Sequence, residues 1–321
     1  MRFKMTSLSS QLKSLQIPDE LSVLNIHNKR ASILFDSSDA ADIDLDTIFA
    51  LGKTGLEELG NIDSHFFEFE KTLFSENFKA IERTQQPKEF NEKLDKKIKE
   101  FLVFLSPYFL IKPAQKTLEY LIRRFRVHVF NVDDLVACIM PFHETNLFAR
   151  VLQILTLKKQ NSKWEWLLPV QKTGSPLSKI TLIQHCVHNS SFQSFICELI
   201  PKAIEISSGK SVDKLKTLFS FYASVLLGIV ESSKNCTEAR VGKILPYIYK
   251  GLKSEIDDYK SSSYIILSQL CLSSTFEEAV ALALVVQICK VSHKSKTYIL
   301  FCRPALRKLG IFAYPSQQFF L

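Results

Sequence analysis

Apolar residues recur at intervals of three and four positions along most of this chain, and this spacing limits its fold more than any other feature. In the segment from Asp213 to Ser232, the apolar residues at these intervals are Leu215, Leu218, Phe219, Tyr222, Val225, Leu226 and Ile229. An α-helix has about 3.6 residues per turn, so these side chains lie on one face of a helix. The segment is therefore predicted to be an amphipathic helix whose apolar face another part of the chain must cover.

Two further segments show related patterns. The first begins with Pro113, which suits the first turn of a helix. Its apolar positions are Leu118, Leu121, Ile122 and Phe125. The second follows Ser274 and Glu277, whose spacing is that of a capping box, and is apolar nearly all round from Ala279 to Cys289. We predict a helix in each segment and expect the second to be central in the core.

Glycine is scarce in the chain, and proline is spaced with some regularity. Only 9 of the 321 residues are glycine, which disfavours strand-and-turn folds and Gly-rich phosphate loops. Five prolines that meet apolar segments are predicted to mark the connections between helices, at intervals of 34, 28, 32 and 45 residues: Pro107, Pro141, Pro169, Pro201 and Pro246. Helix-pair repeats have periods of about 34 to 47 residues, although an irregular helical bundle also places prolines at helix ends. We predict an all-α fold, an irregular HEAT/armadillo-like α-solenoid of stacked helix pairs in one continuous array.

The cysteines and the apolar runs bear on the compartment. Seven cysteines are scattered without a C-x-x-C pair, which is typical of reduced thiols in the cytosol or nucleus. The best apolar runs, at 222–230 and 279–289, fall short of the roughly 20 residues that span a bilayer. The N-terminus has no long apolar segment of the secretory type. We expect a soluble, unsecreted protein with no membrane partner.

Positive charge gathers in the later part of the chain. Residues 1–100 hold 14 Lys and Arg against 18 Asp and Glu, whereas residues 101–321 hold 27 against 15. One helical segment carries a candidate surface for RNA or an acidic partner, formed by Lys112, Lys116, Arg123, Arg124 and Arg126. Glu119 can pair with Arg123 four positions later and reduce the positive field. An ordinary solvated basic face is the alternative, and the salt dependence of RNA binding distinguishes the two.

Several motifs resemble catalytic or ligand sites but lack a necessary part. Gly52-Lys53-Thr54-Gly55 resembles the end of a phosphate-binding loop, yet Thr47 stands where the first glycine is needed. His143-Glu144 begins like a zinc-protease helix, yet Leu147 cannot serve as the second histidine ligand. These motifs therefore favour neither a nucleotide site nor a zinc site.

A second group of residues is close in sequence without being suited to a shared site. His185, Cys186 and His188 are the densest group of possible metal ligands, but neighbouring side chains on a helix diverge by about 100° per residue. Trp164 and Trp166 could stack on bases, although adjacent leucines favour a role in anchoring a helix junction. We expect no enzyme activity, cofactor, metal or small-molecule substrate.

Several strings of residues resemble one eukaryotic family. They are TSLSSQLKSL (6–15), DTIFALGKTGLEEL (46–59), LSPYFLIKPAQKTLEYLIRRF (105–125), PFHETNLFARVLQIL (141–155), WLLPVQKTGSPLSKITLIQHC (166–186) and LPYIYKGLKS (245–254). They are similar to the HEAT-repeat-containing protein one family, also called small nucleolar RNA-associated protein ten. The similarity extends over roughly residues 5–290. Residues 1–4 and the tail at 291–321 depart from the family pattern, and family members are several times longer.

The resemblance implies a nucleolar scaffold of the small-subunit processome that acts in pre-rRNA processing and RNA polymerase I transcription of rDNA. It implies processome proteins, the box C/D small nucleolar RNP and pre-rRNA as partners, with RNA contact either direct or indirect. It supplies no catalytic residue. We expect a helical-repeat domain at 1–290 and a divergent tail at 291–321, in a fragment or truncated product of the longer protein. The alternative function is a direct RNA-binding module that uses the basic helix.

Overall fold

The computed structural model describes residues 31–79, 81–157, 163–232, 238–274 and 276–292, and these ranges contain no β-strand. The predicted all-α class is therefore confirmed. The chain divides into two compact units. Unit 1 comprises Met1–Asp95, Leu110–Val132 and Ile154–Thr156, and unit 2 comprises Lys96–Phe109, Asp133–Gln153 and Leu157–Leu321. The predicted domain boundary at residue 290 stays a prediction, because the tail lies outside the described residues from position 293 onward.

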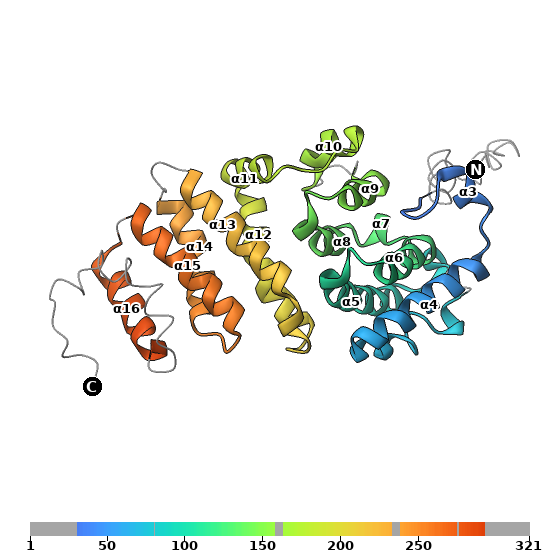
Figure 1. Cartoon of the computed structure of the whole chain (residues 1–321), viewed down its shortest axis with the longest axis horizontal. Helices are drawn as coiled ribbons and strands as arrows, with labels where there is room; N and C mark the ends of the chain where they lie inside the picture. Colours follow the sequence, from blue (N-terminus) through green and yellow to red (C-terminus); the bar gives the residue numbers. More distant parts are fainter. Residues whose placement is uncertain (1–30, 80, 158–162, 233–237, 275, 293–321) are drawn as a thin grey trace, which may run out of the picture. The chain divides into compact units, whose positions relative to one another are not determined.

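Unit 1 is built around two helices that pack along each other, α4 and α6 (Figure 1). Its described helices are α3 (Ser37–Asp42), α4 (Leu45–Ile62), η1 (Ser64–Phe69), η2 (Glu76–Phe78), η3 (Arg83–Gln85), the start of α5 (Lys88–Leu105), α6 (Lys112–Phe125) and α7 (Val127–Phe130). The Asp44 carboxylate accepts a hydrogen bond of 2.7 Å from the Thr47 N–H and caps α4. Helix α6 has Pro113 in its first turn, and its four predicted apolar positions are buried. This predicted amphipathic helix is confirmed.

Unit 2 consists of helices that stack in sequence order. Its described helices are η4 (Ser106–Tyr108), α8 (Val132–Ile139), η5 (Met140–Phe142), α9 (Asn146–Ile154), η6 (Glu165–Leu167), α10 (Leu168–Thr173), α11 (Lys179–His188), α12 (Ser190–Ile206), η7 (Val212–Lys214), α13 (Lys216–Ser232), α14 (Glu238–Leu252), α15 (Asp257–Ser273) and α16 (Glu278–Ser292). Helix α13 packs on α11, α12 and α15, and α14 packs on α15 (Figure 1). The predicted apolar stripe of α13 is buried, which confirms that helix. Within the described ranges no helix has the length and apolar content needed to cross a membrane.

Not every proline marks a connection between helices. Pro107 and Pro141 lie in short 3-10 turns, and Pro169 lies in the first turn of α10, as the spacing predicts. Pro201 and Pro246, however, lie inside α12 and α14. The prediction was wrong for these two positions, because helices long enough to be held by packing on both sides tolerate the loss of one backbone hydrogen bond.

The helix predicted after Ser274 exists as α16, but its capping and burial differ from the prediction. Ser274 ends α15, where its N–H donates to the Leu270 carbonyl at 2.9 Å. The first hydrogen bond of α16 is accepted by the Glu277 carbonyl, so Ser274 does not cap α16. Among its described side chains, Leu284 is buried while Leu282 is exposed. The prediction of a central core helix was therefore wrong for the outward face of α16.

Candidate functional site

The five basic residues predicted as a binding surface occupy α6 and its C-terminal end in unit 1. Lys112 is exposed at the first position of the helix. Arg123 is half-buried in the last turn, and Arg126 is half-buried just beyond it with a left-handed φ of 50°. Lys116 is half-buried and forms an ion pair of 2.6 Å with Glu58 of α4. The helix thus places these four side chains at least partly in contact with solvent, and the surface stays a prediction.

Arg124 has a different role. Only 8% of it is exposed, and its guanidinium donates hydrogen bonds to two backbone carbonyls, at 2.9 Å to Phe78 and also to Ile81. Phe78 is the last residue of η2, and Ile81 lies between η2 and η3, so Arg124 holds this region against α6. Burial lowers the pKa of Arg124. The structure therefore places Arg124 inside unit 1 rather than on the predicted surface.

Glu119 also points into unit 1. One of its carboxylate oxygens accepts hydrogen bonds from the N–H groups of Ile33, at 2.8 Å, and Leu34, at 3.3 Å. Burial raises the pKa of Glu119, and the hydrogen bonds from Ile33 and Ser32, with the charge of Arg123, oppose this only in part. Glu119 therefore holds the segment that precedes α3 against α6.

This burial predicts a pH dependence of stability. Because the folded-state pKa of Glu119 is raised above its usual value of 4.5, the folded chain favours the protonated carboxyl, and this stabilisation is lost as pH rises through the folded-state pKa. The Glu119→Gln variant keeps a hydrogen-bond acceptor and does not titrate. We expect wild type to lose stability relative to Glu119→Gln as the pH rises above about 4.5 in urea unfolding. If the difference in unfolding free energy between the two proteins stays constant with pH, or grows in favour of wild type, Glu119 does not have a raised pKa in the folded chain.

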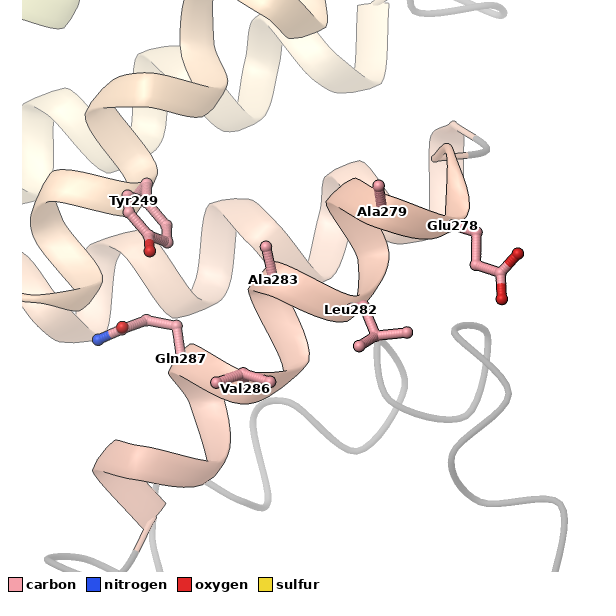
Figure 2. A pocket seen from close by; sticks show the side chains of 7 residues that line it. All are labelled: Tyr249, Glu278, Ala279, Leu282, Ala283, Val286 and Gln287. Atoms are coloured by element: carbon pink, nitrogen blue, oxygen red, sulfur yellow. The ribbon is translucent and has the colours of Figure 1, made fainter.

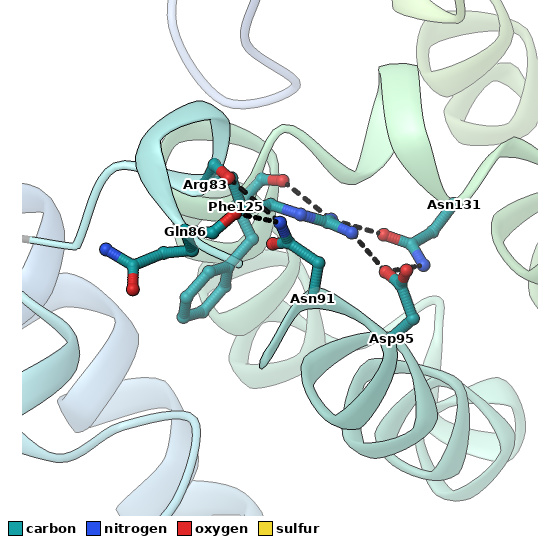
Figure 3. A network of polar contacts seen from close by, with 6 residues as sticks. All are labelled: Arg83, Gln86, Asn91, Asp95, Phe125 and Asn131. Carbon is teal, nitrogen blue, oxygen red and sulfur yellow. Dashed lines mark hydrogen bonds and ion pairs between the residues drawn. The ribbon is translucent and has the colours of Figure 1, made fainter. Parts of the chain in front are cut away.

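A buried polar network in unit 1 is centred on Arg83, which is 6% exposed (Figure 3). Its guanidinium donates to the Phe125 carbonyl at 3.1 Å and to the Asn131 side-chain oxygen at 2.8 Å, and it pairs with Asp95. Asn131 in turn donates to Asp95 at 2.8 Å. Asn91 donates to the Arg83 carbonyl at 3.0 Å. This network joins η3, α5, the end of α6 and the residue that follows α7, so its role is structural.

The Gly-Lys-Thr-Gly string lies in the middle of α4 and not in a phosphate-binding loop. A Cβ atom added at Gly52 would be 2.6 Å from Tyr120 side-chain atoms, and one added at Gly55 would be 2.8 Å from the Pro113 carbonyl oxygen. These glycines therefore allow α4 and α6 to approach each other closely. The Tyr120 side chain lies at this contact, and its hydroxyl donates a hydrogen bond of 3.0 Å to the Leu73 carbonyl.

The other motifs are likewise used within the fold. A ring nitrogen of His143 lies 2.6 Å from the Leu177 carbonyl oxygen, and Glu144 accepts a hydrogen bond of 3.3 Å from the Lys179 N–H. This pair therefore holds the loop before α11. Trp164 is buried and donates from its indole nitrogen to Asp133 at 2.6 Å. It anchors the start of η6, as the sequence favours.

The three possible metal ligands of α11 do not converge. The His185 ring stacks on Trp166 with centroids 3.9 Å apart, Cys186 is buried, and His188 is exposed. Burial raises the pKa of the Cys186 thiol to about 12 and lowers the pKa of His185. No group of three His, Cys, Asp or Glu side chains within the described ranges is placed to hold a metal ion.

Unit 2 contains a cavity of about 150 Å³ that both apolar and charged residues line. Its charged lining residues are Lys99, Asp133, Asp134, Lys163 and Lys202. Each lysine has a carboxylate partner, at 3.8 Å for Lys99, 2.8 Å for Lys163 and 2.6 Å for Lys202. The Cys138 thiol lines the cavity, but burial raises its pKa to about 12, so it is protonated and a poor nucleophile. This thiol is therefore not activated for covalent catalysis.

No family model matches the chain. HEAT repeat-containing protein 1 of Homo sapiens is 44% identical over 298 residues, which are 92% of this chain and 14% of that protein. HEAT repeat-containing protein 1 of Danio rerio is 42% identical over 88% of this chain and 13% of that protein. U3 small nucleolar RNA-associated protein 10 of Debaryomyces hansenii is 35% identical over 51% of this chain and 9% of that protein.

The chain thus spans about one seventh of the length of the human relative. The predicted HEAT-like α-solenoid class is confirmed by these relatives together with the stacked helices. Identity above 40% across nine tenths of the chain also confirms the resemblance stated from the sequence. The chain belongs to the HEAT repeat-containing protein 1 family.

Proposed function

We propose that this chain is a non-catalytic scaffold in ribosome biogenesis that docks onto proteins of the small-subunit processome in the nucleolus. The observation that carries the proposal is its similarity to relatives that are named for association with the U3 small nucleolar RNA. The all-helical units support it, because stacked helices present continuous surfaces for partners. In unit 1, the side chains of Arg83, Lys116 and Arg124 hold helices and loops together.

The finer parts of the proposal concern partners and process. The chain would contact other processome proteins and lie near pre-rRNA and the box C/D small nucleolar RNP, and it would contribute to pre-rRNA processing and to RNA polymerase I transcription of rDNA. Crosslinking of the tagged chain in cells, followed by identification of proteins and RNA, tests these parts together. We expect processome proteins and pre-rRNA above the level of a tag-only control. Recovery of neither class would contradict the proposal.

Direct RNA binding by the basic helix is the second candidate function. Arg124 is buried, and the positions that we assign to phosphate contact are Lys112, which is exposed, and Arg123 and Arg126, which are half-buried. Each phosphate contact on a single strand contributes about −0.7 to the slope of log affinity against log salt concentration. If α6 binds RNA, we therefore expect a slope no steeper than about −2 in a fluorescence anisotropy titration.

Charge removal at the exposed end of α6 makes this test specific. Under the RNA-binding hypothesis, Lys112→Gln flattens the salt slope by about 0.7, whereas Lys88→Gln, on a different exposed surface, leaves it unchanged. A much steeper wild-type slope would place the RNA-binding site elsewhere in the chain. The absence of RNA binding would remove this second function and leave the docking proposal in place.

A further inference from the structure

Helix α16 has apolar residues on two faces, and its inner face packs on α14. Leu284 is buried on this inner face. An apolar hollow remains along the contact, lined by Leu245 and Pro246 of α14 and by Val280 and Leu284 of α16. The inner face therefore accounts for only part of the apolar surface of this helix.

A second apolar stripe, formed by Ala279, Leu282, Ala283 and Val286, begins at the edge of this contact and continues onto the outer face of α16 (Figure 2). Ala279 and Ala283 line both hollows, whereas Leu282 and Val286 line the second one. The positions of the stripe follow the i, i+3, i+4, i+7 spacing of a helix face that packs against another helix. Leu282 is 60% exposed and Val286 is 45% exposed. With Tyr249, Glu278 and Gln287, the stripe lines an open hollow of about 730 Å³.

This stripe is unlike the outer face of a terminal repeat. In stacked helical repeats each unit buries its apolar face on its neighbour, and the last repeat needs a polar outer face to remain soluble. A contiguous apolar stripe on the last described helix therefore indicates a covered surface. A second copy fits poorly, because a stable dimer buries roughly 800 Å² per partner, and two turns of one helix with two alanines offer far less apolar area.

We propose that residues 293–321 of the same chain cover this outer face of α16. The segment follows Ser292, the last residue of α16, directly. Its apolar side chains include the continuous run from Tyr298 to Phe301 and a second group at Leu306, Leu309, Ile311 and Phe312. It can therefore supply apolar contacts close to the stripe without the entropic cost of joining two molecules.

Charge complementarity supports the same occupant. Residues 293–321 contain five Lys and Arg and no Asp or Glu. Among the residues that line the hollow, Glu278 is the charged one. A basic, apolar segment placed here would bury its apolar side chains on the stripe while its cations lie near a carboxylate.

Photo-crosslinking of the full chain tests the proposal. Leu282 is replaced by p-benzoyl-phenylalanine, the purified protein is irradiated, and the crosslinked peptides are identified by mass spectrometry. We expect crosslinks within one chain from position 282 to residues 293–321. The same substitution at Ile180 of α11, which is 70% exposed, serves as the control and is expected to give no enrichment for that segment. Crosslinks between two chains, or none to residues 293–321, would overturn the proposal.

A second variant tests the same contact without a bulky probe. In the full chain, the double substitution Leu282→Gln and Val286→Gln removes the apolar stripe at positions that are already exposed to solvent. We expect trypsin to cleave at the basic residues between 294 and 308 at least about tenfold faster than in wild type, since cleavage follows the population of the uncovered state. Ile180→Gln is the matched control. An unchanged cleavage rate in the double variant would contradict coverage of the stripe.

Discussion

Replacing Arg83 with methionine is expected to lower the free energy of unfolding of unit 1 by about 1–3 kcal/mol. Methionine keeps much of the length of the side chain but removes its hydrogen bonds, so the Asp95 carboxylate and the Asn131 amide lose their shared partner. The cost falls mainly on the Phe125 carbonyl and the Asn131 side-chain oxygen, because a buried polar group left without a partner loses its hydration with no compensation. The Asp95 side chain is 41% exposed and keeps its hydrogen bond from Asn131. Urea unfolding gives the total change, and amide hydrogen exchange in α6 shows whether it arises in unit 1.

The matched control for this prediction is Lys88→Met in the same segment. Lys88 is 90% exposed in its side chain and pairs with Glu92 at 3.7 Å, four positions along α5. An exposed ion pair of this kind contributes only about 0–1 kcal/mol. Similar losses in both variants would mean that the Arg83 network contributes no more to the stability of unit 1 than a surface pair does.

The Gly52→Ala substitution is expected to destabilise unit 1 by about 1–3 kcal/mol. In most helices this change is favourable, because alanine has less conformational freedom to lose on folding. Here the added methyl group would lie 2.6 Å from the Tyr120 side chain, so α4 and α6 would have to move apart. The movement would also weaken the hydrogen bond from the Tyr120 hydroxyl to the Leu73 carbonyl. Urea unfolding measures the change.

Gly242→Ala provides a control with the opposite sign. Gly242 lies inside α14, and an added Cβ atom there meets nothing within 4 Å. We therefore expect a gain of about 0.5–1 kcal/mol. If Gly52→Ala also stabilises the chain, the close approach of α4 and α6 is not what requires glycine at position 52.

The sequence predicted the positions of the helices better than it predicted what packs against them. The spacing of apolar residues from Leu218 to Ile229 identified α13, because burial on one face leaves a periodic signal. The same reasoning placed α16 in the core, since an all-round apolar helix is normally covered on every side. Periodicity shows that a face needs cover but does not show what covers it. A proline is similarly ambiguous, because it can lie at the end of a helix or, like Pro201 and Pro246, inside one.

The predicted binding surface illustrates what a local pattern leaves out. Arg123 and Arg124 are adjacent in sequence, but only Arg124 turns inward to backbone carbonyls more than 40 residues away in the chain. No local sequence pattern indicated the structural role of Arg83, because its partners come from other segments of the chain. These partners are Asp95, Phe125 and Asn131. Contacts of this kind depend on how helices pack. The family, in contrast, was identified correctly from the quoted strings of residues.

We propose that the chain joins its partners through protein surfaces presented by stacked helices. Affinity purification of the tagged full chain from nuclear extract, performed with and without RNase digestion, tests it most directly. We predict that the same small-subunit processome proteins are recovered in both samples. Recovery of these proteins only while RNA is intact would contradict the claim.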